Sequence, residues 1–114
     1  MEKLIKSFSY AINGIQTVWR EEASFRIQTW ITAFVIILGI YLKFASLEWI
    51  ILVVCIVSVL SAEMINTAIE DLCNKVEPKT DPVIGKIKDI TSGFVLVVAI
   101  GAAIIGIMLF SSYF

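Results

Sequence analysis

Three long apolar segments constrain the fold of this chain more than any other feature. They cover roughly residues 27–47, 48–68 and 90–110. Each holds about 20 residues, which is the length that an α-helix needs to cross the hydrocarbon core of a bilayer. Lipid offers no hydrogen-bond partners to an open backbone, so segments of this kind fold as helices. The sequence therefore predicts an all-α membrane protein with one transmembrane helix in each segment.

The composition agrees with this prediction and excludes several other classes. Hydrophobic residues make up 59% of the 114 residues, and the mean hydropathy is +0.92, which is too apolar for an ordinary soluble domain. We expect one membrane domain over residues 1–114, because nothing in the chain resembles a linker. The net charge of −1 argues against a nucleic-acid binder. Histidine is absent, so acid–base chemistry would fall to carboxylates.

The first 26 residues differ from the three apolar segments because they alternate apolar and polar positions at helical spacing. The apolar positions on one side of the expected helix are Leu4, Ile5, Phe8, Ala11, Ile12 and Ile15. A helix with one apolar face and one polar face is suited to the membrane interface. We therefore expect residues 1–26 to form an amphipathic interfacial helix.

Basic residues predict how the chain is oriented in the membrane. They precede the first apolar segment and lie between the second and third, at Lys3, Lys6, Arg20, Arg26, Lys75, Lys79, Lys86 and Lys88. Cytoplasmic segments carry such an excess, so the N-terminus and residues 71–89 are expected in the cytoplasm and the C-terminus outside. Pro78 and Pro82 are expected to break residues 71–89 into a turn.

Small residues in the third apolar segment favour close helix packing. Ala99 and Ala103, and likewise Ala102 and Gly106, lie four positions apart on one helical face. A polar site is hard to shelter within so few helices, and the combination suggests an oligomer.

Polar residues gather where the second apolar segment meets the expected cytoplasmic surface. Glu63, Asn66 and Glu70 fall within about 60° of one another on one helical face and span about 10 Å along its axis. A carboxylate near hydrocarbon is unfavourable by several kcal/mol unless it is paired, solvated or bound to a metal. Glu22, before the first segment, and Lys88-Asp89, before the third, are expected at the same depth.

These residue types favour phosphoryl transfer. Carboxylates hold Mg²⁺, which commonly bridges phosphate oxygens, and Lys88 would neutralise phosphate charge. Glu63 would accept a proton from a hydroxyl group if it lay beside one. No Walker A loop or kinase-type glycine-rich loop occurs in the chain. An enzyme that used a nucleotide here would therefore be of an unusual kind.

Three motifs resemble those of the prokaryotic diacylglycerol kinase family. Residues 63–70, Glu-Met-Ile-Asn-Thr-Ala-Ile-Glu, are similar to its signature E-x-x-N-[ST]-A-[IV]-E. Lys88-Asp89, followed by Ser92-Gly93, resembles its second signature, and the residues from Glu22 to Arg26 resemble its E-x-[AN]-F-R element. The resemblance covers nearly the whole chain.

The resemblance implies a small homotrimeric kinase of the bacterial plasma (inner) membrane. Such an enzyme moves the γ-phosphoryl group of ATP to a lipid alcohol, with Mg²⁺, at sites shared between subunits. It implies that Glu63 is the catalytic base and that Glu22 and Glu70 hold the metal. The nucleotide-binding positions that it implies are Tyr10, Glu22, Asn66, Glu70, Lys88 and Asp89. The lipid-binding positions that it implies are Lys6, Arg26, Glu63 and Ser92.

Several alternatives stay open at this point. The acceptor is expected to be diacylglycerol, giving phosphatidic acid, with undecaprenol as the alternative acceptor. A small multidrug-type transporter is an alternative of another class, although such proteins resemble four-span bundles with an essential Glu in the first span. A purely structural membrane protein is a third option, but it would not need acidic and basic groups gathered at one depth.

Overall fold

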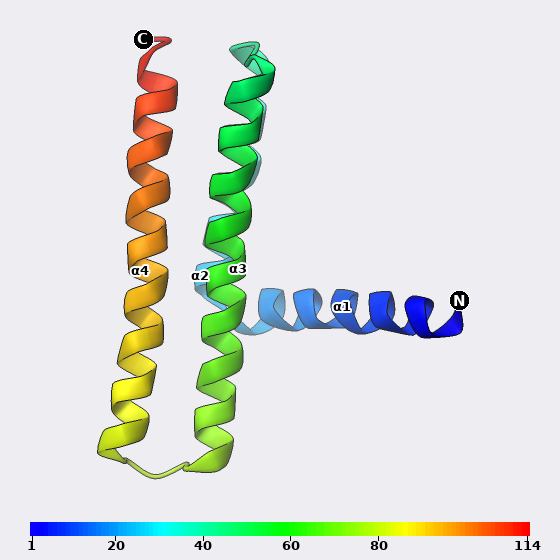
Figure 1. Ribbon diagram of the computed structural model, residues 1–114, viewed down its shortest axis with the longest axis vertical. Helices are drawn as coiled ribbons and strands as arrows, with labels where there is room; N and C mark the ends of the chain where they lie inside the picture. The colour runs from blue at the N-terminus through cyan, green and yellow to red at the C-terminus, as the bar shows by residue number, and fades with distance from the viewer.

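The computed structural model describes all residues from 1 to 114 and is entirely helical (Figure 1). Its helices are α1 (Glu2–Glu21), α2 (Ala23–Tyr41), α3 (Ser46–Val76) and α4 (Pro82–Ser111). Of these, α2, α3 and α4 are long and apolar enough to cross a membrane. This confirms the expectation of three helices that could span a membrane.

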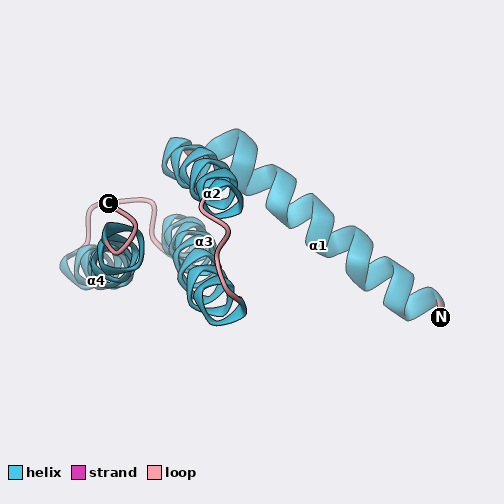
Figure 2. Ribbon diagram, turned by 90° about the horizontal axis from the view of Figure 1, so that it is seen from above, coloured by secondary structure: helices cyan, strands magenta, loops and turns pink.

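The three spanning helices form a bundle, and α1 projects sideways from it. Figure 1 shows α3 and α4 running antiparallel along their whole length, with α2 beside the upper half of α3. The view from above shows α1 leaving the bundle at the start of α2, with its N-terminus far from the other helices (Figure 2). Below the level of α1, α3 and α4 continue together for several turns to the loop that joins them.

The junction between α1 and α2 corrects the first predicted boundary. Residues 1–26 were expected to form a single helix, but the chain turns at Glu22, which has extended dihedral angles (φ −115°, ψ 110°). The first spanning helix therefore starts at Ala23 rather than near residue 27. Nothing in the sequence announces this turn, because Glu22 is neither a glycine nor a proline.

The turn between α2 and α3 corrects the second boundary. The first apolar segment was expected to continue to residue 47, but α2 ends at Tyr41. Phe44 N–H donates to the Gly39 carbonyl at 3.0 Å, and Lys43 N–H donates to the Ile40 carbonyl at 3.1 Å. This pair of bonds defines a Schellman motif, in which Lys43 takes the left-handed position (φ 57°) that glycine usually fills.

An aromatic cluster packs around this turn. The Phe44 ring contacts those of Trp49, Phe110 and Tyr113, with centroid distances between 5.0 and 5.6 Å. Gly39 faces the same cluster, and a β-carbon there would lie 3.0 Å from Trp49 and 3.2 Å from Phe44. The absence of a side chain at Gly39 therefore lets the rings approach the α2 backbone.

The connection between α3 and α4 is shorter than expected. Residues 71–89 were predicted to form a cytoplasmic segment broken by Pro78 and Pro82, but only residues 77–81 lie outside the helices. Pro82 starts α4 instead of interrupting it, because a proline at the first helical position sacrifices no backbone hydrogen bond. The Asp81 carboxylate caps the same helix by accepting from the N–H groups of Val83 and Ile84.

Most side chains of the bundle remain accessible. Only 10 of the 114 residues are buried, and large apolar side chains cover the outside of the spanning helices. A surface of this kind suits lipid rather than water. The buried set nevertheless includes the polar residues Glu63, Thr67 and Thr91, which lie on the lower halves of α3 and α4.

Candidate active site

The strongest candidate site surrounds Glu63, on α3 near the level where α1 and α2 meet. Its side chain is only 6% exposed. The carboxylates of Glu22 and Glu70 are half-buried and lie close enough to act electrostatically on that of Glu63. The fold thus brings together the acidic residue at the α1–α2 junction and two acidic residues on α3. Repulsion of the Glu63 carboxylate by those of Glu22 and Glu70 makes this site attractive to a cation.

Asn66 connects this group to the next turn of α3. Its Nδ2 donates to Oε1 of Glu70 at 3.3 Å. Its Oδ1 is buried and has no hydrogen-bond partner. A buried carbonyl oxygen without a partner is unfavourable, so Oδ1 is a ready acceptor for a ligand or a ligand's cation.

Lys88 lies farther along the bundle, toward the α3–α4 loop. Its Nζ donates to Oδ1 of Asn74 at 2.6 Å, which joins α4 to α3. Asn74 lies eleven residues after Glu63 on one continuous helix, or about 16 Å along the axis. The expectation that all polar site residues share one depth is therefore corrected, because the site extends along the helix.

The contact between Asn74 and Lys88 was not predicted from the sequence. Asn74 lies three residues after Asp71, the last acidic residue of α3, and its spacing from Lys88 predicts no contact. A lysine fourteen residues later reaches it only because the loop between the helices is so short. The sequence did not show how short this loop is, and the contact could not be predicted without that length.

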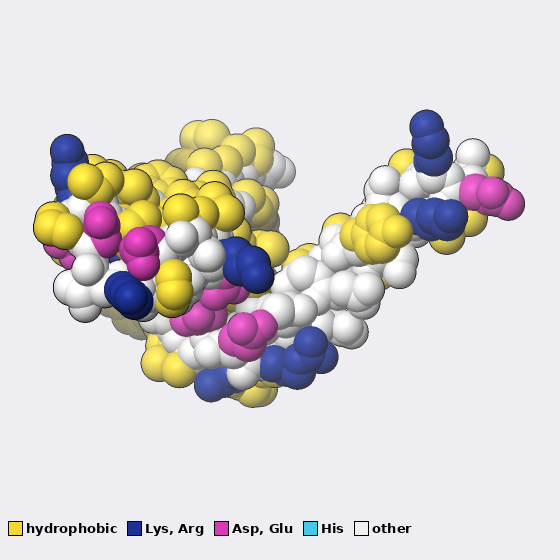
Figure 3. Space-filling view, turned by 90° about the horizontal axis from the view of Figure 1, so that it is seen from below, with side chains coloured by type: hydrophobic (Ala, Val, Ile, Leu, Met, Phe, Trp, Pro, Cys, Tyr) yellow, Lys and Arg dark blue, Asp and Glu magenta, His cyan; other side chains and the backbone are white.

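The residues that follow Lys88 divide between two sides of α4. Asp89 and Ser92 are exposed, whereas Thr91 is only 8% exposed and donates to the Lys88 carbonyl at 3.0 Å. Asp89 and Ser92 are therefore accessible to a ligand that approaches α4 from outside the bundle. Figure 3, which views the molecule from below, shows acidic and basic side chains gathered at this end of the bundle and at the two ends of α1.

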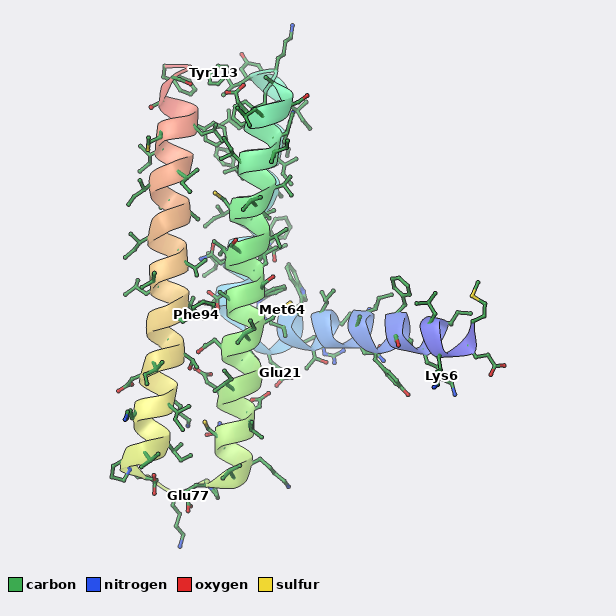
Figure 4. All side chains as sticks on the ribbon, in the orientation of Figure 1. Lys6, Glu21, Met64, Glu77, Phe94 and Tyr113 are labelled. Atoms are coloured by element: carbon green, nitrogen blue, oxygen red, sulfur yellow. The ribbon has the colours of Figure 1, made fainter.

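Two predicted site residues lie away from Glu63 within a single chain. Lys6 is near the free end of α1, well separated from the bundle (Figure 4). Tyr10 is 71% exposed on the same helix. Measured along α1, these residues are about 24 Å and 18 Å from Glu22.

Arg26 contacts the main chain. Its Nη1 donates to the carbonyl oxygens of Trp19 at 2.6 Å and Arg20 at 3.0 Å. These are carbonyls at the end of α1, so the guanidinium group spans the junction between α1 and α2. This contact was not predicted from the sequence.

The oxygen atoms around Glu63 suit a Mg²⁺ ion that is bound partly by the protein and partly by water and phosphate. No three acidic or cysteine side chains come together closely enough to hold a cation by themselves. Magnesium in phosphoryl-transfer sites usually takes one or two carboxylates and completes its shell with water and phosphate oxygens. Glu22 and Glu70 supply carboxylates of this kind, and the unpaired Oδ1 of Asn66 adds a neutral oxygen nearby.

An apolar groove of about 570 Å³ lies between α2, α3 and α4. Its lining includes the small residues Ala99, Ala102, Ala103 and Gly106 of α4. The two polar side chains of the lining are Gln28, in the half of α2 that is nearer Glu22, and Thr32, at the middle of that helix. The groove was not predicted, because it arises from the spacing of the helices.

The fold is that of an all-helical integral membrane protein, with three helices long and apolar enough to span a membrane, and it lacks the glycine-rich phosphate loop of soluble kinases. The family model described as prokaryotic diacylglycerol kinase matches residues 9–110, and the chain belongs to this family of lipid kinases.

Individual relatives agree with that assignment. An undecaprenol kinase from Bacillus subtilis is 32% identical over 96% of this chain and 89% of its own length. A diacylglycerol kinase from Escherichia coli is 26% identical over 98% of this chain and 92% of its own length. A diacylglycerol kinase from Helicobacter pylori is 34% identical over 84% of this chain and 75% of its own length.

Proposed function

We propose that this protein transfers the γ-phosphoryl group of ATP to the hydroxyl group of a membrane lipid, with Mg²⁺, at the cytoplasmic interface. The observation that carries the proposal is the group of three carboxylates at the junction of α1, α2 and α3, with Asn66 and its unpaired oxygen beside them. Membership of the lipid kinase family supplies the reaction class. A transporter is not favoured, since both the family and the number of spanning helices argue against it.

Glu63 is proposed as the general base. It is the buried member of the carboxylate group, on the helix that crosses the membrane. In the reaction, the lipid hydroxyl oxygen attacks the γ-phosphorus, its proton passes to the Glu63 carboxylate, and the bond to the β-phosphate oxygen breaks to release ADP. Proton removal in the transition state is worth about 100- to 10,000-fold in rate.

The nucleotide is proposed to lie along the lower part of α3 and α4. Glu22 and Glu70 would hold the metal, which supplies charge neutralisation for the phosphates when it is bound. Asn66 positions the Glu70 carboxylate through its 3.3 Å hydrogen bond. Lys88 and Asp89 would contact the nucleotide, and the 2.6 Å bond to Asn74 holds the Lys88 ammonium group on the side of α4 that faces α3.

The membrane arrangement follows from charge and from the position of α1. The basic residues of α1, and those on and around the α3–α4 connection, support a cytoplasmic location for the N-terminus and that connection, with the C-terminus outside. The α1 helix, which projects sideways from the bundle, would lie as an amphipathic helix in the interface. The membrane is proposed to be the bacterial plasma (inner) membrane.

A homotrimer with shared sites is part of the proposal. Tyr10 and Lys6 are about 18 and 24 Å along α1 from the Glu22 of their own chain, so they would serve the site of a neighbouring subunit. Ser92 is exposed on α4 and is likewise available to lipid that approaches from outside one subunit. Subunit contacts would also cover some of the exposed apolar surface of the bundle.

The lipid acceptor is proposed to be diacylglycerol, with undecaprenol as the alternative. The curated relatives include kinases named for each of these lipids, at similar identity to this chain. Both acceptors present a single hydroxyl group at the end of long hydrocarbon chains. The chemistry proposed for Glu63 is therefore the same with either lipid.

The experiment that tests the function is transfer of labelled phosphate from Mg·ATP by the purified protein in mixed micelles. Diacylglycerol and undecaprenol are compared side by side, and the Glu63→Gln variant serves as the matched blank. A labelled lipid that forms only with the wild-type protein supports the proposal, and the ratio of kcat/KM values identifies the acceptor. Absence of transfer to both lipids by protein of full helical content would overturn it.

A further inference from the structure

The junction between α1 and α2 contains a single residue outside the helices. Glu22 has extended dihedral angles, while α1 ends at Glu21 and α2 starts at Ala23. Two main-chain hydrogen bonds join Glu22 to its neighbouring helices: Glu22 N–H donates to the Val18 carbonyl of α1 at 2.9 Å, and Arg26 N–H of α2 donates to the Glu22 carbonyl at 3.3 Å. An abrupt turn of this kind leaves the last carbonyls of α1 without partners inside their own helix.

Arg26 supplies the missing donors. Its Nη1 donates to the Trp19 carbonyl at 2.6 Å and to the Arg20 carbonyl at 3.0 Å. The side chain comes from the first turn of α2, so it reaches back across the junction to the end of the preceding helix.

The charge of Arg26 is favourably placed with respect to α1 and unfavourably placed with respect to α2. A cation in the first turn of α2 opposes the partial positive charge at the start of that helix. The same cation at the end of α1 meets the partial negative charge of the terminal carbonyls, where it is stabilising. The bonds to Trp19 and Arg20 are charge-assisted and therefore stronger than bonds between neutral groups.

The packing around the junction links this contact to the candidate site. Val18 and Phe25, on either side of Glu22, are 8% and 5% exposed, and the Trp19 and Trp30 rings pack at 6.3 Å. The Glu22 carboxylate lies near that of Glu63. The angle between α1 and α2 therefore determines where Glu22 stands relative to α3.

We propose that Arg26 is a positioning residue, whose guanidinium group fixes the angle between α1 and α2 and thereby holds the Glu22 carboxylate beside Glu63. The role of Arg26 in fixing the angle between the helices follows from its hydrogen bonds to the Trp19 and Arg20 carbonyls. The consequence for turnover rests on the proposed kinase function.

A distance measurement tests the role of Arg26 in fixing this angle without any activity assay. Nitroxide labels are placed on exposed serines of α1 and α3 (Ser9→Cys and Ser58→Cys) in a background carrying Cys55→Ala and Cys73→Ala. Labelled chains are diluted with unlabelled chains in nanodiscs so that only distances within one chain are recorded. Arg26→Gln is expected to broaden the α1–α3 distance distribution at least about twofold, and Arg26→Lys is expected to broaden it less, because an ammonium group retains the charge but not the planar fork.

Arg20→Gln is the matched control. It removes an arginine side chain from the last turn of α1 but leaves the main-chain carbonyl of residue 20, which accepts from Arg26, in place. Its distance distribution is expected to equal that of the wild type. A wild-type distribution in Arg26→Gln, at unchanged helical content, would overturn the proposal.

Kinetics separate positioning from direct lipid binding. Positioning predicts that Arg26→Gln lowers kcat by about 10- to 100-fold and raises the Mg²⁺ requirement, with partial rescue by Arg26→Lys, as for residues that orient a metal ligand. A raised lipid KM with unchanged kcat and an unchanged distance distribution would assign Arg26 to the lipid alone and contradict the inference. If Arg26→Gln broadens the distance distribution but the wild-type protein transfers no phosphate, the role of Arg26 at the junction is supported and the kinase proposal is overturned.

Discussion

The Tyr113 hydroxyl group donates to both carboxylate oxygens of Glu48, at 2.6 and 2.7 Å, and so connects the C-terminus to the start of α3. The same carboxylate accepts from the Ala45 N–H at 2.9 Å, as the second half of a capping box does. One side chain therefore caps α3 and holds the end of α4 against it. This end of the bundle is closed, whereas the opposite end carries the candidate site.

The contact between Tyr113 and Glu48 predicts a dependence on alkaline pH. The hydrogen bond to Glu48 raises the pKa of Tyr113 above its ordinary value of 10.0, because the neutral phenol is the form that donates. The contribution to stability is therefore complete below the ordinary pKa and is lost as the pH rises through the raised pKa. Alkaline titration of the phenolate absorbance should show one late-titrating tyrosine that disappears in Tyr113→Phe.

Glu48→Gln provides the comparison for this titration. It removes the charge while retaining an acceptor, so the Tyr113 pKa is expected to move back toward its ordinary value. Identical titration curves for Glu48→Gln and the wild type would contradict the assignment.

Glu63→Gln is expected to lower kcat by about 100- to 10,000-fold, because the amide cannot accept the proton of the lipid hydroxyl. Its oligomeric state and helical content should be unchanged, since the side chain makes no hydrogen bond on which the fold depends. Turnover in mixed micelles is the measurement, and Glu21→Gln, an exposed acid at the end of α1, is the control. A Glu63→Gln enzyme that retained a tenth of wild-type turnover would rule out the role of base.

Glu70→Ala is expected to raise the Mg·ATP concentration needed for half-maximal rate by about 10- to 100-fold, because a proposed metal ligand is lost and the Asn66 amide loses its acceptor. Titrations with Mg²⁺ at fixed ATP measure the effect. Asp71→Ala, which removes the next acidic side chain on an exposed position, is expected to leave the requirement unchanged. Equal shifts in both variants would indicate general loss of surface charge instead.

Asn74→Leu is expected to weaken nucleotide binding several-fold while leaving the lipid KM unchanged. The substitution keeps the approximate volume but removes the acceptor that orients the Lys88 ammonium group. Equilibrium binding of a non-hydrolysable ATP analogue is the measurement. Lys86→Gln controls for charge on α4, and unchanged binding in Asn74→Leu would show that Lys88 does not need this support.

Gly39→Ala is expected to destabilise the protein by about 1–3 kcal/mol through overpacking, because the new methyl group would lie 3.0 Å from Trp49 and 3.2 Å from Phe44. Gly101→Ala is the matched control within another spanning helix, and its β-carbon would meet nothing within 4 Å. Both variants gain about 1 kcal/mol in helix propensity, so the difference between them isolates the clash. Unfolding free energies in mixed micelles that agree for the two variants would contradict the prediction.

The hydrophobic pattern was sufficient to predict the spanning helices but not their ends. A transmembrane helix is set by the length of an apolar segment, which a sequence displays directly. The turn at Glu22 and the turn at Lys43 have no glycine or proline to mark them, because one is stabilised by Arg26 and the other by the aromatic cluster around Gly39. Both depend on side chains that reach across a junction.

The site was predictable in part for a related reason. Glu63, Asn66 and Glu70 lie on one helix, where spacing alone places them on one face. The contact between Lys88 and Asn74 depends on how two helices are joined, and the distance of Lys6 from its own bundle depends on the turn at Glu22. The sequence pattern therefore predicted positions within one helix but not the contacts and distances between helices.

Because α3 is one continuous helix, the positions of its residues along the axis can be compared with the thickness of the membrane. From Ser46 to Glu63 the helix rises about 26 Å, and from Ser46 to Glu70 about 36 Å, on either side of the roughly 30 Å depth of a hydrocarbon core. If Ser46 lies at the far boundary, Glu63 falls just inside the apolar layer, where the proposed lipid acceptor would present its hydroxyl group, and Glu70 falls outside, where the proposed nucleotide would bind. The number of helical turns between Glu63 and Glu70 would then match the separation between a lipid acceptor and a water-soluble phosphate donor. A thicker or thinner bilayer would misalign the two reactants without altering any contact inside the protein.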